Sequence, residues 1–287
     1  MKIAIIGTGR LGTSLGRALA AKGERIAALY DLDPKAAARA RRRIGRGKIA
    51  RTAEEAARAA DVLLLCVPDR AVAATAKALA AARRDWRGKI VLHTCGVLSS
   101  RALAPLRRAG ARTGSLHPAQ AFPRPDLPPR HFRGVSFAVE GDREAAAFGR
   151  RLARRIGGVP FSLRPEDKPL YHAACGMASS LLVPLFDLAA ELLEDLGLSR
   201  RKAEAVLGPL VEGTVRGIGR YGRAKALTGP ITRNDAETVD IHLKALRAHP
   251  EHGRIYRQLG MRALKLAEAG GLGRKDAATI RRKLGGK

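Results

Sequence analysis

The sequence predicts an α/β protein with two domains, a doubly wound parallel sheet followed by an all-helical dimerisation domain. Strand and helix signals alternate over residues 1–164, as a parallel sheet requires. The first strand leads directly into a glycine-rich turn. From residue 165 to 287 strand patterns vanish and helical periodicity takes over. A chain of 287 residues exceeds the usual size of one domain, so we expect domains at 1–164 and 165–287.

The turn after the first strand has the form of a dinucleotide-binding fingerprint. The strand Lys2–Ile6 is followed by Gly7-Thr8-Gly9-Arg10-Leu11-Gly12 and then by a helical pattern. Gly7 permits the tight turn, and Gly9 lets backbone N–H groups approach a pyrophosphate. Gly12 allows the helix to pack closely on the strand. The helix begins at about Arg10 and would point its N-terminus at the phosphates. A purely structural turn is the alternative.

An acidic residue indicates which nucleotide is preferred. Asp31 follows Gly12 by nineteen positions and ends the second predicted strand, Arg25–Tyr30. A carboxylate there accepts hydrogen bonds from the ribose hydroxyls of NAD and repels a 2′-phosphate, so NAD is favoured. NADP stays open because Arg10 and the basic run 39–43 could supply a counter-charge. The predicted cofactor-binding residues are Gly7, Gly9, Arg10, Leu11, Gly12, Asp31, Val67 and Pro68.

Further buried strands are expected in the first domain. Their ranges are 61–68, 89–93, 113–118 and 135–139, with a short strand near Phe161. Ligands of such sheets bind beyond the carboxyl ends of the strands. Thr94 and His117 follow two of these predicted strand ends, so both are candidates to line a cleft.

The second half reads as long helices over 168–196, 199–221, 235–248 and beyond 251. Asn234 with Glu237 fits an N-cap and capping-box pair. A small bundle cannot hide so much apolar surface alone, so we expect a homodimer built on residues 168–287. The apolar stripe that carries this expectation includes Leu181, Leu182, Leu185, Leu188, Leu192 and Leu193.

Composition limits the partners and the compartment. Lys and Arg number 54 against 26 Asp and Glu, giving a net charge of +28, but the basic residues are dispersed and aromatics are only 4%. Nucleic acid is therefore an unfavoured partner, whereas a small anionic substrate would be attracted. The reason for the basic composition is not evident from the sequence.

Three separated cysteines, Cys66, Cys95 and Cys175, suggest a reduced compartment without a disulfide frame or metal site. The first strand begins at residue 2, which leaves no room for a signal peptide, and the apolar stretch 181–193 is too short and polar to span a bilayer. We expect a cytoplasmic protein that neither spans a membrane nor holds a metal.

Three motifs point to a family. They are Ser115-Leu116-His117-Pro118, Lys168-x-x-Tyr171-His172-Ala173-Ala174, and the segment 226–235, Ala-Leu-Thr-Gly-Pro-Ile-x-Arg-x-Asp. With these the chain resembles Rossmann-like proteins with a C-terminal domain of unknown function, family 2520. These are related to 6-phosphogluconate, β-hydroxyacid, ketopantoate and pyrroline-5-carboxylate reductases. The resemblance implies a nucleotide-dependent reductase whose helical domain dimerises and closes a cleft over the nicotinamide.

The sequence departs from the family pattern at three positions. Cys95 stands where the family usually has Ser, Ser180 where it has Asn, and Asn234 where it has Gly. No family role can be carried to Cys95 or Ser180, and Cys95 reads better as a small space-filling residue than as a nucleophile. Asn234 is a mild change because Asn tolerates left-handed backbone.

Lys168 and His172 are the predicted catalytic residues. They are four residues apart on one helix and so share a face. The resemblance matches them to a Lys and an Asn of ketopantoate and β-hydroxyacid reductases. A positioned ammonium would polarise a carbonyl or imine and deliver the proton, and His172 would orient the substrate or relay that proton. A solvated Lys and a helix-face His are the structural alternative.

The remaining candidates are predicted to bind substrate. His117 could also be a turn residue fixed by Pro118, and the residues of the 226–235 loop could simply hold that loop, so both interpretations stay open. The predicted substrate-binding set is Thr94, His117, Thr228, Arg233 and Asp235.

These observations favour an NAD(P)H-dependent reductase of a small carboxylate-bearing ketone, with ketopantoate the preferred substrate. An imine reductase acting on a pyrroline-5-carboxylate type of substrate is the alternative within the same class. A non-catalytic nucleotide-binding regulatory dimer is the alternative outside it, since it would keep the glycines without needing Lys168.

Overall fold

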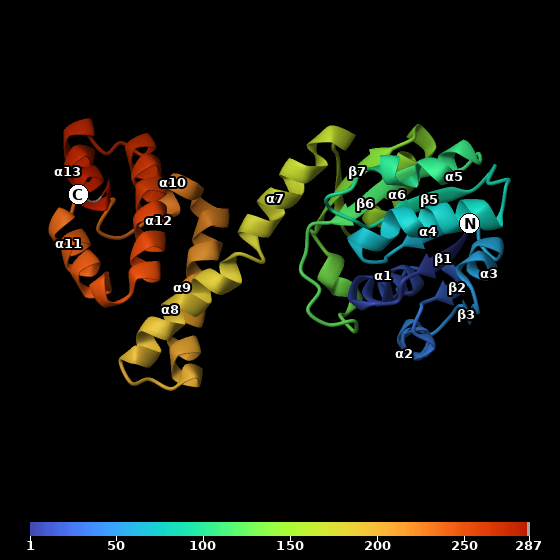
Figure 1. The fold of residues 1–287 in the computed structure, drawn as a ribbon, viewed down its shortest axis with the longest axis horizontal. Coiled ribbons are helices and arrows are strands. Elements are labelled where there is room, and N and C mark those ends of the chain that lie inside the picture. Colours follow the sequence, from blue (N-terminus) through green and yellow to red (C-terminus); the bar gives the residue numbers. More distant parts are fainter. Residues whose placement is uncertain (286–287) are drawn as a thin grey trace. The chain divides into compact units, whose positions relative to one another are not determined.

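A computed structural model describes residues 1–285 of the chain. It divides into two compact units, Met1–Ser180 and Leu181–Lys287, each treated by itself below (Figure 1). The change from strands to helices falls near residue 164, as the sequence predicts. The compact units divide later, because the helix that begins at Lys168 packs on the sheet through its first turn.

The first unit is built on one eight-stranded sheet. Its order is β3-β2-β1-β4-β5-β6-β7-β8. The strands are β1 Lys2–Ile6, β2 Arg25–Tyr30, β3 Lys48–Ile49, β4 Val62–Leu65, β5 Ile90–His93, β6 Arg112–Pro118, β7 Ser136–Gly141 and β8 Val159–Ser162.

The sheet departs from the expected parallel arrangement at one place. All neighbouring strands are parallel except β6 and β7, which pair antiparallel with His117 opposite Ala138. The loop after β6 returns without a crossover helix, which permits this reversal. The order reverses beside β1, where β2 lies on one side and β4 on the other, so the carboxyl ends of β1 and β4 flank a topological switch point.

Helices cover both faces of this sheet (Figure 1). Alternate residues of β1 separate the two cores: Ile3 and Ile5 pack in one cluster, while Ala4 and Ile6 pack in the other. This is the two-residue period of a strand buried on both sides. The helices are α1 Arg10–Ala21, α2 Pro34–Ile44, α3 Ala53–Arg58, α4 Asp69–Ala82, α5 Ala104–Arg108, α6 Arg143–Arg155 and α7 Lys168–Ala178, with 3₁₀ turns η1 Ser100–Leu103, η2 Pro129–Phe132 and η3 Pro165–Asp167.

The proline-containing loop after β6 is tied to α1. The Arg17 guanidinium donates to the backbone carbonyl oxygens of Asp126 and Leu127. This anchor fixes the segment that follows His117.

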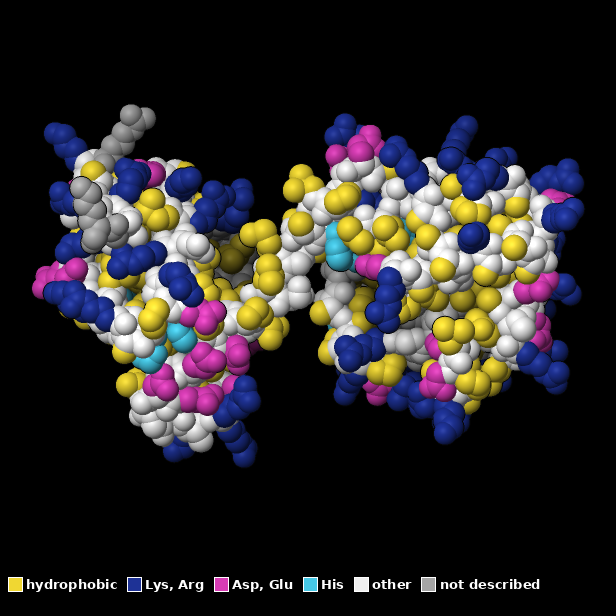
Figure 2. Space-filling view, in the orientation of Figure 1, with side chains coloured by type: hydrophobic (Ala, Val, Ile, Leu, Met, Phe, Trp, Pro, Cys, Tyr) yellow, Lys and Arg dark blue, Asp and Glu magenta, His cyan; other side chains and the backbone are white. Residues whose placement is uncertain are grey.

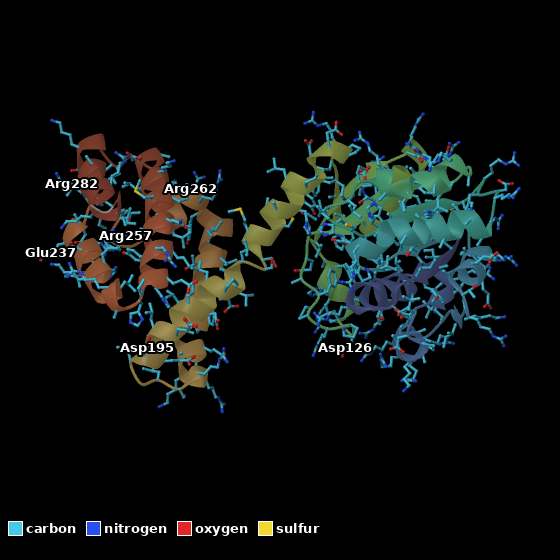
Figure 3. All side chains as sticks on the ribbon, viewed as in Figure 1. Asp126, Asp195, Glu237, Arg257, Arg262 and Arg282 are labelled. Atoms are coloured by element: carbon cyan, nitrogen blue, oxygen red, sulfur yellow. The ribbon has the colours of Figure 1, made fainter. Side chains whose placement is uncertain are left out.

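The second unit is entirely helical within the described residues 181–285. Its apolar core gathers Val239, Leu243, Leu264, Ile280 and Leu284. Arg257 of α12 donates to the carbonyl oxygens of Lys283 and Leu284 and so ties down the last helix (Figure 3). The helices are α8 Leu182–Asp195, α9 Arg200–Tyr221, α10 Arg223–Ala226, α11 Ala236–Ala245, α12 Pro250–Ala269 and α13 Arg274–Gly285, with the 3₁₀ turn η4 Leu246–Ala248.

Two helix predictions need correction. The helix expected over 168–196 is interrupted at residues 179–181, which form a turn between α7 and α8. The N-cap of α11 is Asp235, whose carboxylate accepts from the Thr238 N–H at 2.9 Å, and not Asn234. Asn234 instead adopts a left-handed conformation with φ 56°, which Asn tolerates better than most residues.

One apolar run meets the length and composition criteria for a membrane span. It covers Pro165–Asp195, with mean hydropathy 1.6, although the sequence predicts that its apolar part is too short. The run contains α7, of 11 residues, and α8, of 14 residues, on either side of the 179–181 turn. Each helix is shorter than the ~20 residues that a bilayer requires, so the run is weak evidence for a membrane span.

Candidate functional site

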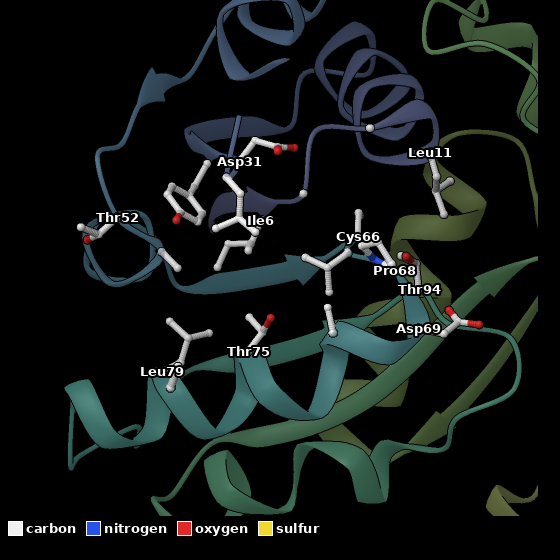
Figure 4. Close-up of a pocket in the computed structure, with 18 of the residues that line it drawn as sticks. Ile6, Leu11, Asp31, Thr52, Cys66, Pro68, Asp69, Thr75, Leu79 and Thr94 are labelled. Carbon is white, nitrogen blue, oxygen red and sulfur yellow. The ribbon is translucent and has the colours of Figure 1, made fainter. Parts of the chain in front are cut away.

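A large cavity lies at the carboxyl ends of β1, β2 and β4 in the first unit (Figure 4). Its volume is 840 Å³. Most of the predicted cofactor residues line it, together with Thr94, which the sequence assigns to substrate binding. The predicted residues on its wall are Gly7, Gly9, Arg10, Leu11, Asp31, Val67, Pro68 and Thr94.

The glycines of the turn have the steric roles that dinucleotide binding requires. A Cβ on Gly7, whose φ is +90°, would lie 2.5 Å from the Cys66 carbonyl oxygen. A Cβ on Gly12 would lie 2.0 Å from the Gly7 carbonyl oxygen, so Gly12 packs on the turn without lining the cavity. Open space adjoins Gly9, and α1 has no side-chain cap there. The turn therefore fits a pyrophosphate at the helix N-terminus.

Asp31 is anchored at the rim of this cavity. Its Oδ2 accepts from the Thr8 N–H at 2.6 Å and the Thr8 hydroxyl at 3.0 Å, and its Oδ1 accepts from the Asp33 N–H at 3.1 Å. Arg39 pairs with Asp33 at 3.2 Å. Asp31 thus presents a carboxylate on the cavity wall, and Arg39 of the basic run is already paired with Asp33.

A second cavity of the first unit, called the histidine cavity below, is lined by two histidines. Its volume is 440 Å³, and His117 from the end of β6 and His172 from α7 both line it. Their rings meet edge to face with centroids 5.7 Å apart. Cys175, Gly176 and Ser180 also lie on its wall.

The loop after β5 connects the two cavities. Thr94 lines the first cavity, and two residues later Gly96 lies against both histidine rings of the second. A Cβ on Gly96 would lie 2.3 Å from Cδ2 of His172 and 2.8 Å from Nε2 of His117. Only glycine lets both rings approach this backbone.

Lys168 is fully buried beneath this loop. Its Nζ donates to the Cys95 carbonyl oxygen at 2.8 Å and to the Ser115 hydroxyl at 2.5 Å. It lines neither of these cavities and forms no ion pair within the described residues 1–285. Glu140 is a nearby carboxylate, but it accepts from the Ser100 N–H and hydroxyl, each at 2.7 Å. Burial lowers the pKa of the Lys168 ammonium.

Burial keeps other groups of this region neutral. It lowers the pKa of His93 to about 4 and that of His117 to about 3, and the Lys168 charge adds to both effects. The His93 Nε2 has no hydrogen-bond partner among the described residues. Burial also raises the pKa of the Cys66 thiol to about 12 and that of Cys95 to about 11, so neither is a thiolate at neutral pH.

The other predicted substrate residues belong to the second unit. Thr228 lines a separate apolar cavity there, and neither Arg233 nor Asp235 does. The Asp235 carboxylate also accepts from the Thr238 hydroxyl at 2.7 Å. Within its own unit, Asp235 is thus engaged as a helix cap.

The sequence assigns no role to several residues of the site. Asp69 follows Pro68 at the start of α4 and lines the first cavity, and its place just beyond a strand end is a signal that could have found it. Three further residues belong to the site through contacts made in the folded chain: Ser115 with Lys168, Gly96 with His172, and Tyr171 with His117. No pattern of spacing in the sequence indicates those contacts.

Basic side chains are scattered over the visible surfaces of both units rather than gathered in one patch (Figure 2). The surface gives no further indication of a nucleic-acid site in this view.

Two families of protein domains match parts of the chain. Residues 1–118 match the Rossmann-like domain, and residues 135–263 match the domain of unknown function DUF2520. No curated protein matches the sequence significantly.

Solved structures share the fold. A provisionally assigned NADP oxidoreductase from Bacteroides fragilis is 24% identical with TM-score 0.75, over 92% of this chain and 98% of that one. A reductive aminase from Aspergillus terreus, in complex with NADPH and ethyl levulinate, is 16% identical with TM-score 0.63, over 98% and 90%. A pyrroline-5-carboxylate reductase from Coxiella burnetii is 18% identical with TM-score 0.61, over 98% of both chains.

Proposed function

The chain joins a Rossmann-like domain to a DUF2520 domain, and from this premise we propose that it is an NAD(P)H-dependent reductase of a small carboxylate-bearing ketone. The observation that carries the proposal is the shared loop 94–96. It borders a cavity fit for a dinucleotide on one side and holds two imidazole rings on the other. Reduction needs this adjacency, because the hydride donor and the acceptor atom must meet within a few ångströms.

NAD(P)H, when bound, would supply the hydride at the nicotinamide end of the first cavity. The open backbone at Gly9 and the uncapped start of α1 would hold its pyrophosphate. Asp31 would accept hydrogen bonds from the ribose hydroxyls, which favours NADH over NADPH.

In this proposal the two histidines bind and orient the substrate. His117 and His172 line the second cavity and bring ring nitrogens towards one patch of backbone. The prediction that Lys168 is catalytic is kept in a modified form. Its ammonium would act across the Ser115 hydroxyl, and its charge would offset negative charge that develops on the substrate heteroatom.

We further propose a cytoplasmic homodimer that captures an anionic substrate. Exposed apolar side chains on α8 and α9 support the dimer, and the net charge of +28 favours anion capture. Substrate residues Thr228, Arg233 and Asp235 stay proposals, either in the same subunit or from a partner.

Ketopantoate is the proposed substrate, and a pyrroline-5-carboxylate type of imine is the second candidate. Solved structures of similar fold include a pyrroline-5-carboxylate reductase and a reductive aminase, so we keep the imine as the second candidate substrate. A regulatory dimer that binds nucleotide without turnover is the remaining alternative.

The test follows NADH and NADPH oxidation against ketopantoate and pyrroline-5-carboxylate in parallel. Faster oxidation with ketopantoate is the expected result, with NADH preferred. Turnover of the imine alone would replace the ketone proposal by the imine one. Tight NADH binding without any turnover would favour the regulator, and no nucleotide binding would contradict all three.

A further inference from the structure

Tyr171 forms a side-chain pair with His117 that the proposed function does not use. The Tyr171 hydroxyl lies 2.8 Å from Nδ1 of His117, and the rings meet edge to face. The edge of Phe161, from β8, packs against the Tyr171 ring with centroids 5.8 Å apart. Tyr171 therefore contacts two strands of the sheet, β8 through Phe161 and β6 through His117.

The protonation states of the pair are well defined at neutral pH. Burial lowers the pKa of His117 to about 3, so the ring is neutral and carries one N–H. Burial likewise raises the pKa of the Tyr171 phenol, which keeps its proton. The phenol O–H is the more acidic of the two donors, which favours donation to Nδ1 with the ring proton on Nε2.

Nε2 of His117 is the ring nitrogen directed to Gly96. A Cβ at Gly96 would lie 2.8 Å from Nε2 of His117 and 2.9 Å from Nε2 of His172. Both rings line the histidine cavity. An Nε2–H on His117 is therefore available to an acceptor in that cavity.

We propose that Tyr171 is a positioning residue that fixes His117 in the Nε2–H tautomer, so that His117 presents a hydrogen-bond donor to a carboxylate or carbonyl oxygen of the substrate. The role rests on the proposed function for the identity of the ligand, but the tautomer is a property of the free protein. A neutral imidazole N–H can polarise an oxygen that accepts its hydrogen bond.

The tautomer is measured directly by ¹⁵N NMR of the full-length protein labelled at histidine. His117→Gln removes one set of signals and so identifies the His117 ring. In the unsubstituted protein at neutral pH, Nδ1 of His117 should show the shift of an unprotonated nitrogen and Nε2 that of an N–H. The reverse pattern would overturn the proposal.

Tyr171→Phe tests the cause. The ring and its contact with Phe161 stay, but the hydroxyl is lost, so the His117 signals should move towards a mixture of tautomers. Substrate KM should rise, and kcat/KM should fall about tenfold, the effect of one lost hydrogen bond. NADH affinity should not change, because Tyr171 does not line the cofactor cavity.

The second unit offers a matched control. There the Tyr256 hydroxyl lies 2.9 Å from Nδ1 of His242 in the same edge-to-face geometry. Tyr256→Phe should alter the signals of His242 and leave those of His117 unchanged. Unchanged His117 signals in Tyr171→Phe would overturn the proposal even if the protein is an active reductase. The expected NMR pattern in a protein without turnover would refute the proposed function and leave the positioning role intact.

Discussion

Lys168 carries an ammonium with no exposed surface and only neutral hydrogen-bond partners, Cys95 and Ser115. A buried charge is costly unless it is paired and hydrogen-bonded, since charged groups lose much of their hydration in the interior. Under the proposed function, the Lys168 charge would act in the transition state of carbonyl reduction.

We therefore predict that Lys168→Ala lowers kcat by about 10² to 10⁴ while NADH affinity stays near normal, since the charge acts mainly in the transition state. The measurements are kcat with the best substrate and NADH affinity by fluorescence titration. Lys89 provides the control, because its Nζ also donates to backbone carbonyls, at Ala57 and Ala60, away from the histidines. Lys89→Ala should lower stability but not kcat. A near-normal kcat in Lys168→Ala would remove Lys168 from the reaction.

Asp31 should decide the choice of nucleotide. Asp31→Ser removes the charge that accepts the ribose hydroxyls, so NADH binding should weaken by about 1 to 3 kcal/mol and NADPH binding should improve relative to it. Both affinities are measured by titration. Asp33→Ser is the control, because Asp33 caps α2 and pairs with Arg39 without lining the cavity. Equal or tighter NADH binding in Asp31→Ser contradicts the assignment.

His93 should make stability depend on pH. Its pKa is about 4 in the folded chain against 6.5 for a free histidine, so between these values the unfolded chain binds more protons. The contribution of His93 to the free energy of unfolding is fully present above pH 6.5. It is lost as the pH falls to 4, and the loss is on the order of 3 kcal/mol. His117 acts in the same direction.

The check is the free energy of unfolding in urea at several pH values. His93→Gln should reduce the loss between pH 6.5 and 4, and the control His131→Gln should preserve it. An identical pH dependence in His93→Gln and the unsubstituted chain would show that His93 is not the group responsible.

At the scale of elements, two glycines of the turn between β1 and α1 have different roles, Gly12 in packing and Gly9 in the approach of the nucleotide to the backbone. Gly12→Ala would place a Cβ 2.0 Å from the Gly7 carbonyl oxygen, whereas a Cβ on Gly9 meets nothing within 4 Å. Gly12→Ala should therefore lower both Tm and NADH affinity. Gly9→Ala should weaken NADH binding with little change in Tm, because it fills only the approach to the backbone. Equal Tm losses would show that the two glycines have the same structural role.

Elements with strong periodicity were predictable from the sequence, and those defined by context were not. The buried strands β1, β4 and β5 stand out as apolar runs. In contrast β3 has two residues, too few to form a pattern. The break between α7 and α8 falls in Ser179-Ser180-Leu181, which contains neither Gly nor Pro to mark it.

The candidate site divides in the same way. The glycine turn and Asp31 are close in sequence and have a known spacing, so the sequence could predict that they lie together, and they line one cavity. The histidine cluster depends on contacts between β6 and α7, such as His117 with Tyr171, which are 54 residues apart. The sequence also does not predict that Lys168 is buried, because a lysine near the start of a helix usually lies in solvent.

At the scale of the whole molecule, the exposed apolar faces of the second unit predict a homodimer. Val206 and Leu210 lie four residues apart on α9 and are 56% and 65% exposed. Light scattering should give twice the chain mass of 30.6 kDa, and the double change Val206→Glu with Leu210→Glu should give the single mass. Val159→Glu, on β8 of the sheet unit, should leave the dimer intact. A monomer at micromolar concentration for the unsubstituted chain contradicts the prediction.

The loop Thr94–Gly96 lines the first cavity through Thr94, and through Gly96 it lies against the rings of His117 and His172, which line the second. A ligand that displaces this loop from one side changes the shape presented on the other. Such coupling is reciprocal: whatever factor the nucleotide contributes to substrate affinity, the substrate must return to nucleotide affinity. Under the proposed function we therefore expect substitutions in this short loop to change both affinities together, so that selection for a new substrate at these positions would also act on the choice of cofactor.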